Sequence, residues 1–272
     1  MNDTPTHALV QAITQRYQQL VPRTQQLPLA GSRPLTVSGR VSGWITSKAT
    51  RVIASLPGVH VEPEAVHITA ASKQGFSINT VMGQIARELA DAGCLRGWRD
   101  ELLDVVGEGR RLAVLERAAL RPLGLLTRAV HLNAWTPDGR LWVARRASTK
   151  STDPDMWDTL VGGLACAGET LDTSLLRESN EEAGLQPADI EKRSPLRIIL
   201  RMHRRLPEGY QVEDVLVSEC ILADSVKLQN LDGEVSEIQA VTLGQLWSMI
   251  QAGDFTLEAE LVILDALLQR MR

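Results

Sequence analysis

The segment that most constrains the fold is residues 162–185, GGLACAGETLDTSLLRESNEEAGL. Small or apolar residues recur in it at every fourth position, the spacing that places side chains on one face of an α-helix. The spacing predicts a helix over residues 171–183, and Gly184 can supply the left-handed residue that ends it. The four recurring residues are Leu171, Leu175, Ser179 and Ala183.

Three glutamates lie on one side of this predicted helix. Glu178, Glu181 and Glu182 stand at positions i, i+3 and i+4, so their carboxylates gather on one face. Exposed like charges at this spacing cost roughly a few tenths of a kcal/mol, so a solvated acidic surface is the ordinary interpretation. The functional alternative is a bound divalent cation, which would neutralise the repulsion.

The glutamates belong to a longer pattern of fixed spacing, which favours the functional alternative. The pattern runs Gly163, five residues, Glu169, seven residues, Arg177-Glu178, two residues, Glu181-Glu182, one residue, Gly184-Leu185. It resembles the Nudix box of the MutT-like diphosphohydrolases. Ser179 departs from the family pattern, which usually has an aliphatic residue at that position to pack the helix inward.

The resemblance implies a magnesium site, with Mn²⁺ as a substitute. It makes Glu178 and Glu182 the chief ligands, Glu181 a ligand or the group that holds the metal's water, and the Gly163 carbonyl a further ligand. Hydrolysis of a diphosphate is a reaction that suits this metal, because water attacks a diphosphate only if cations neutralise the developing charge. Mg²⁺ takes oxygen ligands and binds through a few carboxylates plus phosphate oxygens.

The resemblance also gives Arg177 and Glu169 orienting roles in catalysis. Arg177 can pair with Glu181 one helical turn further on, whereas a fork aimed back at Glu169 would pin the preceding loop to the helix. Both arrangements remain open from the sequence.

Segments outside the box extend the resemblance to the Nudix proteins related to thiamin pyrophosphokinase fusion enzymes. That resemblance implies a Nudix fold, a mixed β-sheet sandwiched between α-helices, preceded by a smaller α/β N-terminal domain. It also implies thiamine-type diphosphates, notably damaged analogues, as substrates. The segments are GWRDELLDVV, LERAALRPLGLLTRAVHLNAW, LWVARRASTKSTDPDMWDTLVGGL, LQNLDGEVSEI and GDFTLEAELVILDALL.

The residue pattern of the sequence changes near Gly124, where strand-like runs begin. We expect an N-terminal domain over residues 1–123, which selects substrate or mediates assembly, and a Nudix domain over residues 124–272. Apolar periodicity predicts a helix near residues 6–21 that Pro22 stops.

A second predicted helix starts at Ser77, which can cap it, and ends near Gly93. In the second half, AVHLNAW and LWVARR read as strands joined by the turn sequence TPDGR.

Four residues outside the box are further candidates for the site. Arg146 and Lys150, beside a strand end, are candidates to hold the diphosphate, and a solvated loop is the alternative. Glu234 is the candidate general base, chosen over Glu237, with a solvated turn as its alternative. Trp157 is the candidate for stacking a heteroaromatic ring, although a tryptophan beside an apolar strand often belongs to the core.

Composition limits the partners. With a formal net charge of −4, the chain lacks the excess of positive charge that favours binding to nucleic acid or to an anionic membrane. Three cysteines far apart in the sequence fit a reducing compartment, and no apolar segment is long enough to span a membrane. We expect a cytoplasmic protein whose partner is a small-molecule diphosphate, with monomer or homodimer left open. Cys166, inside the box, is expected to be a buried small hydrophobe.

The predicted function is magnesium-dependent hydrolysis of a small organic diphosphate to a monophosphate and inorganic phosphate. Four alternatives remain. They are a hydrolase of nucleotide or nucleotide-sugar diphosphates, an isomerase resembling isopentenyl-diphosphate isomerase with Cys166 as proton donor, a non-catalytic Nudix-like binding module, and an RNA-cap hydrolase. The complete set of glutamates argues against the isomerase and the binding module, and the missing basic stripe argues against the cap hydrolase.

Overall fold

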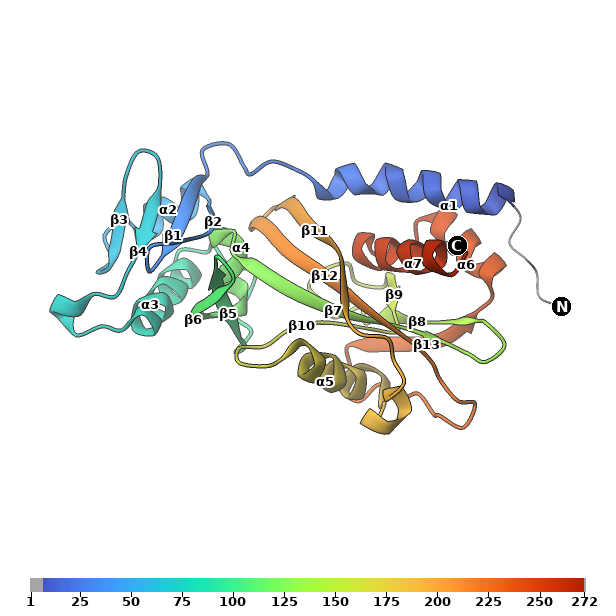
Figure 1. The fold of residues 1–272 in the computed structure, drawn as a ribbon. Coiled ribbons are helices and arrows are strands. Elements are labelled where there is room, and N and C mark those ends of the chain that lie inside the picture. Colours follow the sequence, from blue (N-terminus) through green and yellow to red (C-terminus); the bar gives the residue numbers. More distant parts are fainter. Residues whose placement is uncertain (1–6, 272) are drawn as a thin grey trace.

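The computed structural model of the protein describes residues 7–271. Figure 1 shows a small sheet with its own helices at one end of the molecule and a larger sheet, covered by helices, at the other. The architecture is mixed α/β, and, as expected, a mixed sheet between helices is preceded by a smaller α/β domain.

The larger sheet is mixed and, within the described residues, has seven strands. Its order is β11-β12-β7-β8-β13, with β10 paired to β7 and β9 paired to β8. Strand β12 runs parallel to β7, and the other pairs are antiparallel. The strands are β7 (Leu126–Trp135), β8 (Leu141–Arg146), β9 (Trp157–Thr159), β10 (Val161–Leu164), β11 (Arg197–Leu206), β12 (Gly209–Ile221) and β13 (Val235–Val241).

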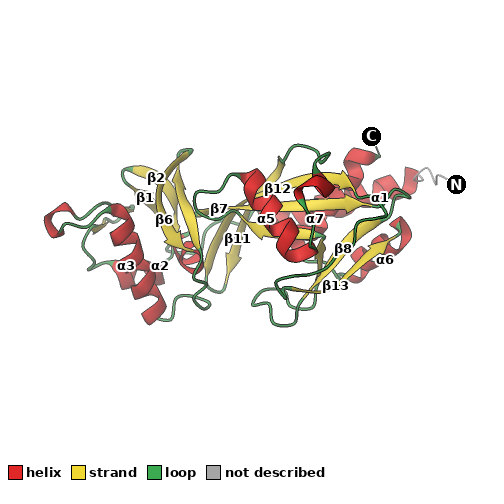
Figure 2. Ribbon diagram, turned by 90° about the horizontal axis from the view of Figure 1, so that it is seen from below, coloured by secondary structure: helices red, strands yellow, loops and turns green. Residues whose placement is uncertain are grey.

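Helices cover both faces of this sheet because its central strand buries both of its faces. On β7, Val130 and Leu132 belong to the cluster that includes Leu175 of α5 (Leu171–Ala183). Trp135 of the same strand belongs to the cluster formed with α6 (Leu243–Ala252) and α7 (Leu257–Arg270). Figure 2 shows α5 lying across one face of the strands. The short helix η4 (Pro187–Ile190) follows α5.

Helix α5 begins and ends where the sequence predicts. The Thr170 side chain caps its start by accepting a hydrogen bond from the Thr173 N–H, and Gly184 ends it with φ of 67°. Ser179, the departure from the family pattern, is fully buried, and its hydroxyl has no hydrogen-bond partner among the described residues. The helix is therefore fixed at both ends, and its inner face is less apolar than an aliphatic residue would make it.

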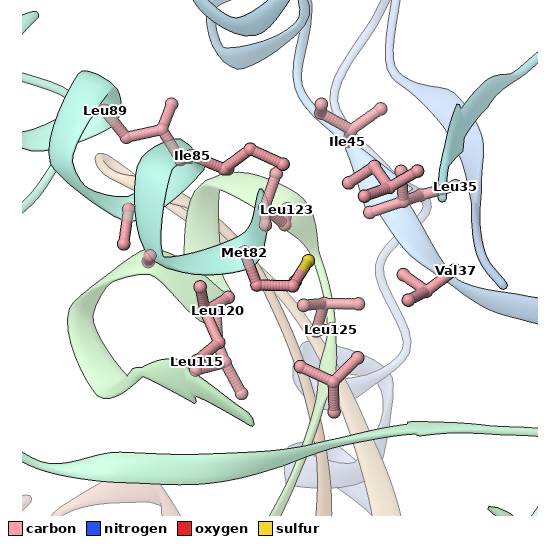
Figure 3. Packing of buried hydrophobic residues seen from close by; sticks show 14 of the residues in the cluster. Leu35, Val37, Ile45, Met82, Ile85, Leu89, Leu115, Leu120, Leu123 and Leu125 are labelled. Atoms are coloured by element: carbon pink, nitrogen blue, oxygen red, sulfur yellow. The ribbon is translucent and has the colours of Figure 1, made fainter. Parts of the chain in front are cut away.

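The N-terminal domain is built on a four-stranded sheet of order β2-β1-β4-β3 and a hairpin, β5-β6, within the described residues. Helix α3 starts after the Ser77 cap, as predicted, and buries Met82, Ile85 and Leu89 against Leu120 and Leu123 (Figure 3). The elements are β1 (Arg33–Val37), β2 (Arg40–Ile45), α2 (Ser47–Ile53), β3 (Val59–Val61), β4 (Val66–Ile68), η2 (Ser72–Gln74), α3 (Ile78–Asp91), β5 (Leu102–Gly107), β6 (Arg110–Glu116), η3 (Arg117–Ala119) and α4 (Leu120–Leu123).

The core of the N-terminal domain continues into the second half of the chain. Leu125, Ala129 and Leu164 are buried in the same hydrophobic cluster as the residues of α3. At this junction strand β2 approaches the end of α4 so closely that a Cβ on Gly43 would lie 2.6 Å from the Gly124 carbonyl oxygen. The two domains therefore share packing, and only glycine fits at position 43.

Helix α1 (His7–Leu20) packs on the far side of the molecule from the N-terminal sheet. Its Ile13 and Leu20 are buried in the cluster formed by α6 and α7, and Arg16 forms an ion pair with the buried Glu260 at 2.5 Å. The helix confirms the sequence prediction, and Pro22 follows it in the short helix η1 (Val21–Thr24). The division of the chain near Gly124 stays a prediction, and α1 contacts the second half of the chain.

None of the helices in residues 7–271 has both the length and the apolar composition that crossing a bilayer requires.

Gly43 at the junction and Gly83 in α3 have different surroundings, and this difference gives a stability prediction. Gly43→Ala forces a methyl group into the Gly124 carbonyl and should destabilise the protein by about 1–3 kcal/mol. Gly83→Ala lies in the exposed middle of α3, where an added Cβ meets nothing within 4 Å, and should stabilise it by about 1 kcal/mol. Thermal unfolding of the two variants beside wild type measures both shifts, and shifts of the same sign would contradict this account of the junction.

Candidate active site

Glycine 163 allows the box strand to lie directly against the box helix. Strand β10 pairs with β7, and its Gly163 faces α5. A Cβ at this position would lie 2.0 Å from the carboxyl carbon of Glu178. The carboxylate therefore occupies the space that any other residue would fill, close to the main chain whose carbonyl the resemblance makes a ligand.

Arg177 connects the box loop to the box helix. Its Nε donates to Glu169 Oε1 at 3.0 Å, and its Nη1 donates to Glu178 Oε1 at 2.8 Å and to Glu181 Oε2 at 2.9 Å. Its Nη2 donates to the Leu164 carbonyl at 3.1 Å. Both pairings left open by the sequence are present, because one guanidinium serves loop and helix together. The orienting roles of Arg177 and Glu169 stay predictions.

Glu182 is the most deeply buried of the three helix carboxylates, with 6% of its surface exposed. Its Oε2 accepts a hydrogen bond from the Gly162 N–H at 2.8 Å. Burial, and next to it the charge of Glu178, raises the pKa of Glu182 to about 8, although the Gly162 N–H opposes the rise. Burial likewise raises the pKa of Glu178. The protein thus places too little positive charge near Glu178 and Glu182 to offset the cost of burying their two carboxylates.

A divalent cation bound here would supply the missing positive charge. Residues 7–271 contain no group of three or more His, Cys, Asp or Glu side chains arranged to hold a metal by themselves. Mg²⁺ takes only part of its oxygen ligands from protein and the rest from water and substrate phosphate. Glu178, Glu182 and the main chain at Gly163 offer oxygens within one small volume, so the residues present fit the metal that the resemblance implies.

Lys150 and Glu234, both candidates from the sequence, form an ion pair with each other. They line a small niche that also contains Glu182 and Gly162. Burial lowers the pKa of Lys150, and the negative charge of Glu182 opposes that effect. The structure therefore brings the candidate phosphate-binding lysine and the candidate general base together beside the box, and both roles stay predictions.

Arg146 lines the same niche, but much of its guanidinium is already occupied. Its Nη1 donates to Asp158 Oδ2 at 2.9 Å, and its Nη2 donates to the Thr152 carbonyl at 3.0 Å. Arg145, on the other face of the strand, donates to the Asp155 carbonyl instead. Arg146 thus orders the loop that carries Lys150, whatever contact it makes with substrate.

Trp157 lies apart from the niche. It belongs to β9, forms a bridge to Phe255, and packs against the hydrophobic cluster of α6 and α7. The structure does not bring it to the lining of the niche or of the larger cleft beside it. Its placement matches the core alternative that the sequence also allowed.

Cys166 is not the buried apolar residue that the sequence suggested. It is only partly buried, its thiol donates to Glu101 Oε1 at 3.2 Å, and Arg177 Nη2 lies 3.3 Å from its sulfur. Burial, and next to it the hydrogen bond to Glu101, raises the pKa of the thiol to about 12. The expectation was wrong because the N-terminal domain contributes a carboxylate to the box loop.

A cleft of about 780 Å³ lies between the two domains and adjoins the niche. Seven Lys or Arg side chains line it, four from before Gly124 and three from after it. The N-terminal contributors Trp98, Arg99 and Arg117 are not among the candidates predicted from the sequence. Two of them lie in the segment GWRDELL, whose only signal in the sequence is the resemblance.

Comparison with known protein families identifies the class. The NUDIX domain model matches residues 125–261, which is just over half of the chain, and a domain of unknown function (DUF4743) matches residues 12–127. The chain therefore belongs to the Nudix family. This confirms the resemblance to the Nudix family that was drawn from the box.

Two curated relatives have Nudix hydrolase names. Nudix hydrolase 20, chloroplastic, of Arabidopsis thaliana is 30% identical over 193 residues, which cover 68% of this chain and 51% of the relative. The uncharacterized Nudix hydrolase SCO1686 of Streptomyces coelicolor is 42% identical over 86 residues, covering 31% and 48%. The crystal structure of DR0079 from Deinococcus radiodurans has a TM-score of 0.44 and 25% identity, covering 63% of this chain and 99% of that one. The chain spans about half the length of the two curated relatives.

The buried Glu182 gives a prediction for the metal-free protein. Its pKa is about 8 in the folded state and about 4.3 in an unfolded chain, so the native state retains a proton that the unfolded state loses. Stability should fall as pH rises between these values, by at most about 1.4 kcal/mol per pH unit.

Glu182→Gln removes this contribution while keeping the shape and the acceptor for the Gly162 N–H. In the presence of EDTA, the melting temperature of the variant should exceed that of wild type at pH 8, and the gap should shrink toward pH 5. Melting curves that stay parallel across this range would show that Glu182 is ionised in the native protein.

Proposed function

We propose that the chain catalyses magnesium-dependent hydrolysis of a small organic diphosphate to a monophosphate and inorganic phosphate. The observation that carries the proposal is the pair of buried carboxylates, Glu178 and Glu182, held against Gly162 and Gly163 beside a cleft rich in Lys and Arg. Carboxylates attract a metal and the basic residues attract phosphate, so the two charge types suit one ligand, a metal diphosphate.

In this proposal Glu178 and Glu182 hold Mg²⁺, with Glu181 and the Gly163 carbonyl nearby. The metal, when bound, supplies positive charge that offsets the charge developing on the phosphate oxygens. Arg177 keeps Glu178 and Glu181 in place through its two hydrogen bonds from Nη1. Glu169 fixes Arg177 in turn, so the box loop holds the helix carboxylates in their positions.

Outside the box, Lys150 binds a phosphate oxygen and Glu234 accepts the proton of the attacking water. Water adds to one phosphorus, the bond between that same phosphorus and the bridging oxygen breaks, and the bridging oxygen leaves with the other phosphate, which takes up a proton from solvent. The Lys150–Glu234 ion pair supports these roles, because a substrate phosphate that draws Lys150 away leaves a free carboxylate beside it.

The finer part of the proposal is a thiamine-type diphosphate, supported by the resemblance outside the box. A cleft of about 780 Å³ is within the range of small-molecule sites, and it has room for a nucleotide as well. Nucleotide and nucleotide-sugar diphosphates are therefore the second class to test.

A substrate panel tests the proposal directly. We expect purified protein with Mg²⁺ to release inorganic phosphate from oxidised thiamine diphosphate faster than from a nucleoside triphosphate, and faster than it cleaves a nucleotide sugar or isopentenyl diphosphate. Identifying the organic product separates hydrolysis from isomerisation. A nucleotide or sugar nucleotide that wins by about tenfold would replace the thiamine-type substrate and leave the chemistry standing, whereas tight binding without turnover of any member would identify a binding module.

The metal ligands provide a second prediction. Glu178→Gln and Glu182→Gln each remove one charged ligand, so kcat at saturating Mg²⁺ should fall by about 10³-fold or more. Glu191→Gln, at an exposed position beyond the box helix, is the matched control and should retain wild-type turnover. Wild-type rates for Glu182→Gln at limiting Mg²⁺ would refute the ligand assignment.

A further inference from the structure

The N-terminal domain supplies part of the wall of the cleft through residues 96–101, just before β5. The backbone of this segment is fixed, because the Arg99 N–H donates to Glu116 Oε1 at 2.8 Å, and Glu116 is 3% exposed. The Arg99 guanidinium also donates to the Ser151 hydroxyl, next to Lys150 in the loop of the Nudix domain. The wall is therefore tied directly to the segment that carries the phosphate-binding candidate.

Trp98 is the one aromatic side chain among the described residues that line the cleft. It is 46% exposed, which is unusual for so large an apolar group unless a partner covers it. Its indole N–H already donates to Asp100 Oδ1 at 2.7 Å, and Asp100 adopts a positive φ of 57°. The polar edge of the indole is thus satisfied within the protein, while apolar ring surface remains accessible in the cleft.

The cleft and the box niche form one continuous site. Arg146, Lys150 and Glu234 line both of them. Arg117, which lines the cleft from the N-terminal side, forms an ion pair with Glu101 at 2.6 Å. Burial raises the pKa of Glu178, and Arg117 is among the cations that oppose that rise, so its charge reaches the box helix. A ligand with its phosphates at the box can therefore extend along the cleft toward Trp98.

We propose that Trp98 is a specificity-determining residue, which stacks on a planar ring in the organic part of the diphosphate. The proposal rests on the proposed function for the position of the phosphates and adds a substrate class to it. Diphosphates that carry a heteroaromatic ring are favoured over aliphatic ones. The stacking surface comes from the N-terminal domain. The Nudix domain therefore binds the phosphates of the ligand, and the N-terminal domain binds its ring.

Trp98→Ala tests this with three substrates, thiamine diphosphate, ADP-ribose and isopentenyl diphosphate. Stacking on an aromatic side chain is lost in the variant, so kcat/KM for the two ring-bearing substrates should fall by about tenfold or more, mainly through KM. For isopentenyl diphosphate, which has no ring, the change should stay below about twofold. Trp98→Phe should recover most of the loss.

Trp44→Ala is the matched control, because Trp44 is also an exposed tryptophan of the N-terminal domain, at 39%, and does not line the cleft. It should leave all three values of kcat/KM unchanged, and melting temperatures identify any variant that is misfolded. An equal loss on isopentenyl diphosphate, or no loss on a ring-bearing substrate that wild type hydrolyses, would overturn the assignment of Trp98.

Binding separates this proposal from the proposed function. Thiamine diphosphate should quench the tryptophan fluorescence of wild type and of Trp44→Phe, and the quenching should be lost in Trp98→Phe. Quenching by this probe in a protein that hydrolyses neither these three substrates nor any member of the panel above would refute the hydrolase and support the stacking residue. Equal quenching in Trp98→Phe would refute the stacking residue alone.

Discussion

The guanidinium of Arg177 is the interaction on which the arrangement of the site depends. It bonds to Glu169 in the box loop, to Glu178 and Glu181 on the box helix, and to the carbonyl of Leu164 at the end of β10. Strand, loop and helix meet at this one planar group. Without it, Glu169 in the loop would face Glu178 and Glu181 on the helix with no positive charge between them, and repulsion would push the loop away from the helix in the absence of metal.

The same loop is held from the other side by the N-terminal domain. The Ala167 N–H donates to the Leu102 carbonyl at 2.8 Å, and the Cys166 thiol donates to Glu101. Strand β5 of one domain therefore supports the box loop of the other. This explains why the N-terminal core continues into Leu164, and it means that the shape of the active site is a property of both domains.

The sequence was sufficient for features set by local spacing and insufficient for features set by contacts across the chain. Helix α5 could be predicted with both of its ends, because Thr170, the repeat of four and Gly184 are all local signals. The Lys150–Glu234 pair joins residues 84 positions apart, and the Arg99–Ser151 contact joins residues 52 positions apart. Trp157 drew attention for its nearness to Gly163 in the sequence, whereas Trp98 reaches the cleft only because the two domains fold against each other.

Helix α1 alters how the N-terminal domain is connected. From α1, which packs against α7, the chain passes to the small sheets and α3 and returns at β7 (Figure 1). Two segments of chain, one after α1 and one before β7, therefore connect the small domain to the larger sheet and its helices. Rotation of the small domain relative to the larger sheet would have to bend both of these segments, so motion about a single hinge would strain the other connection.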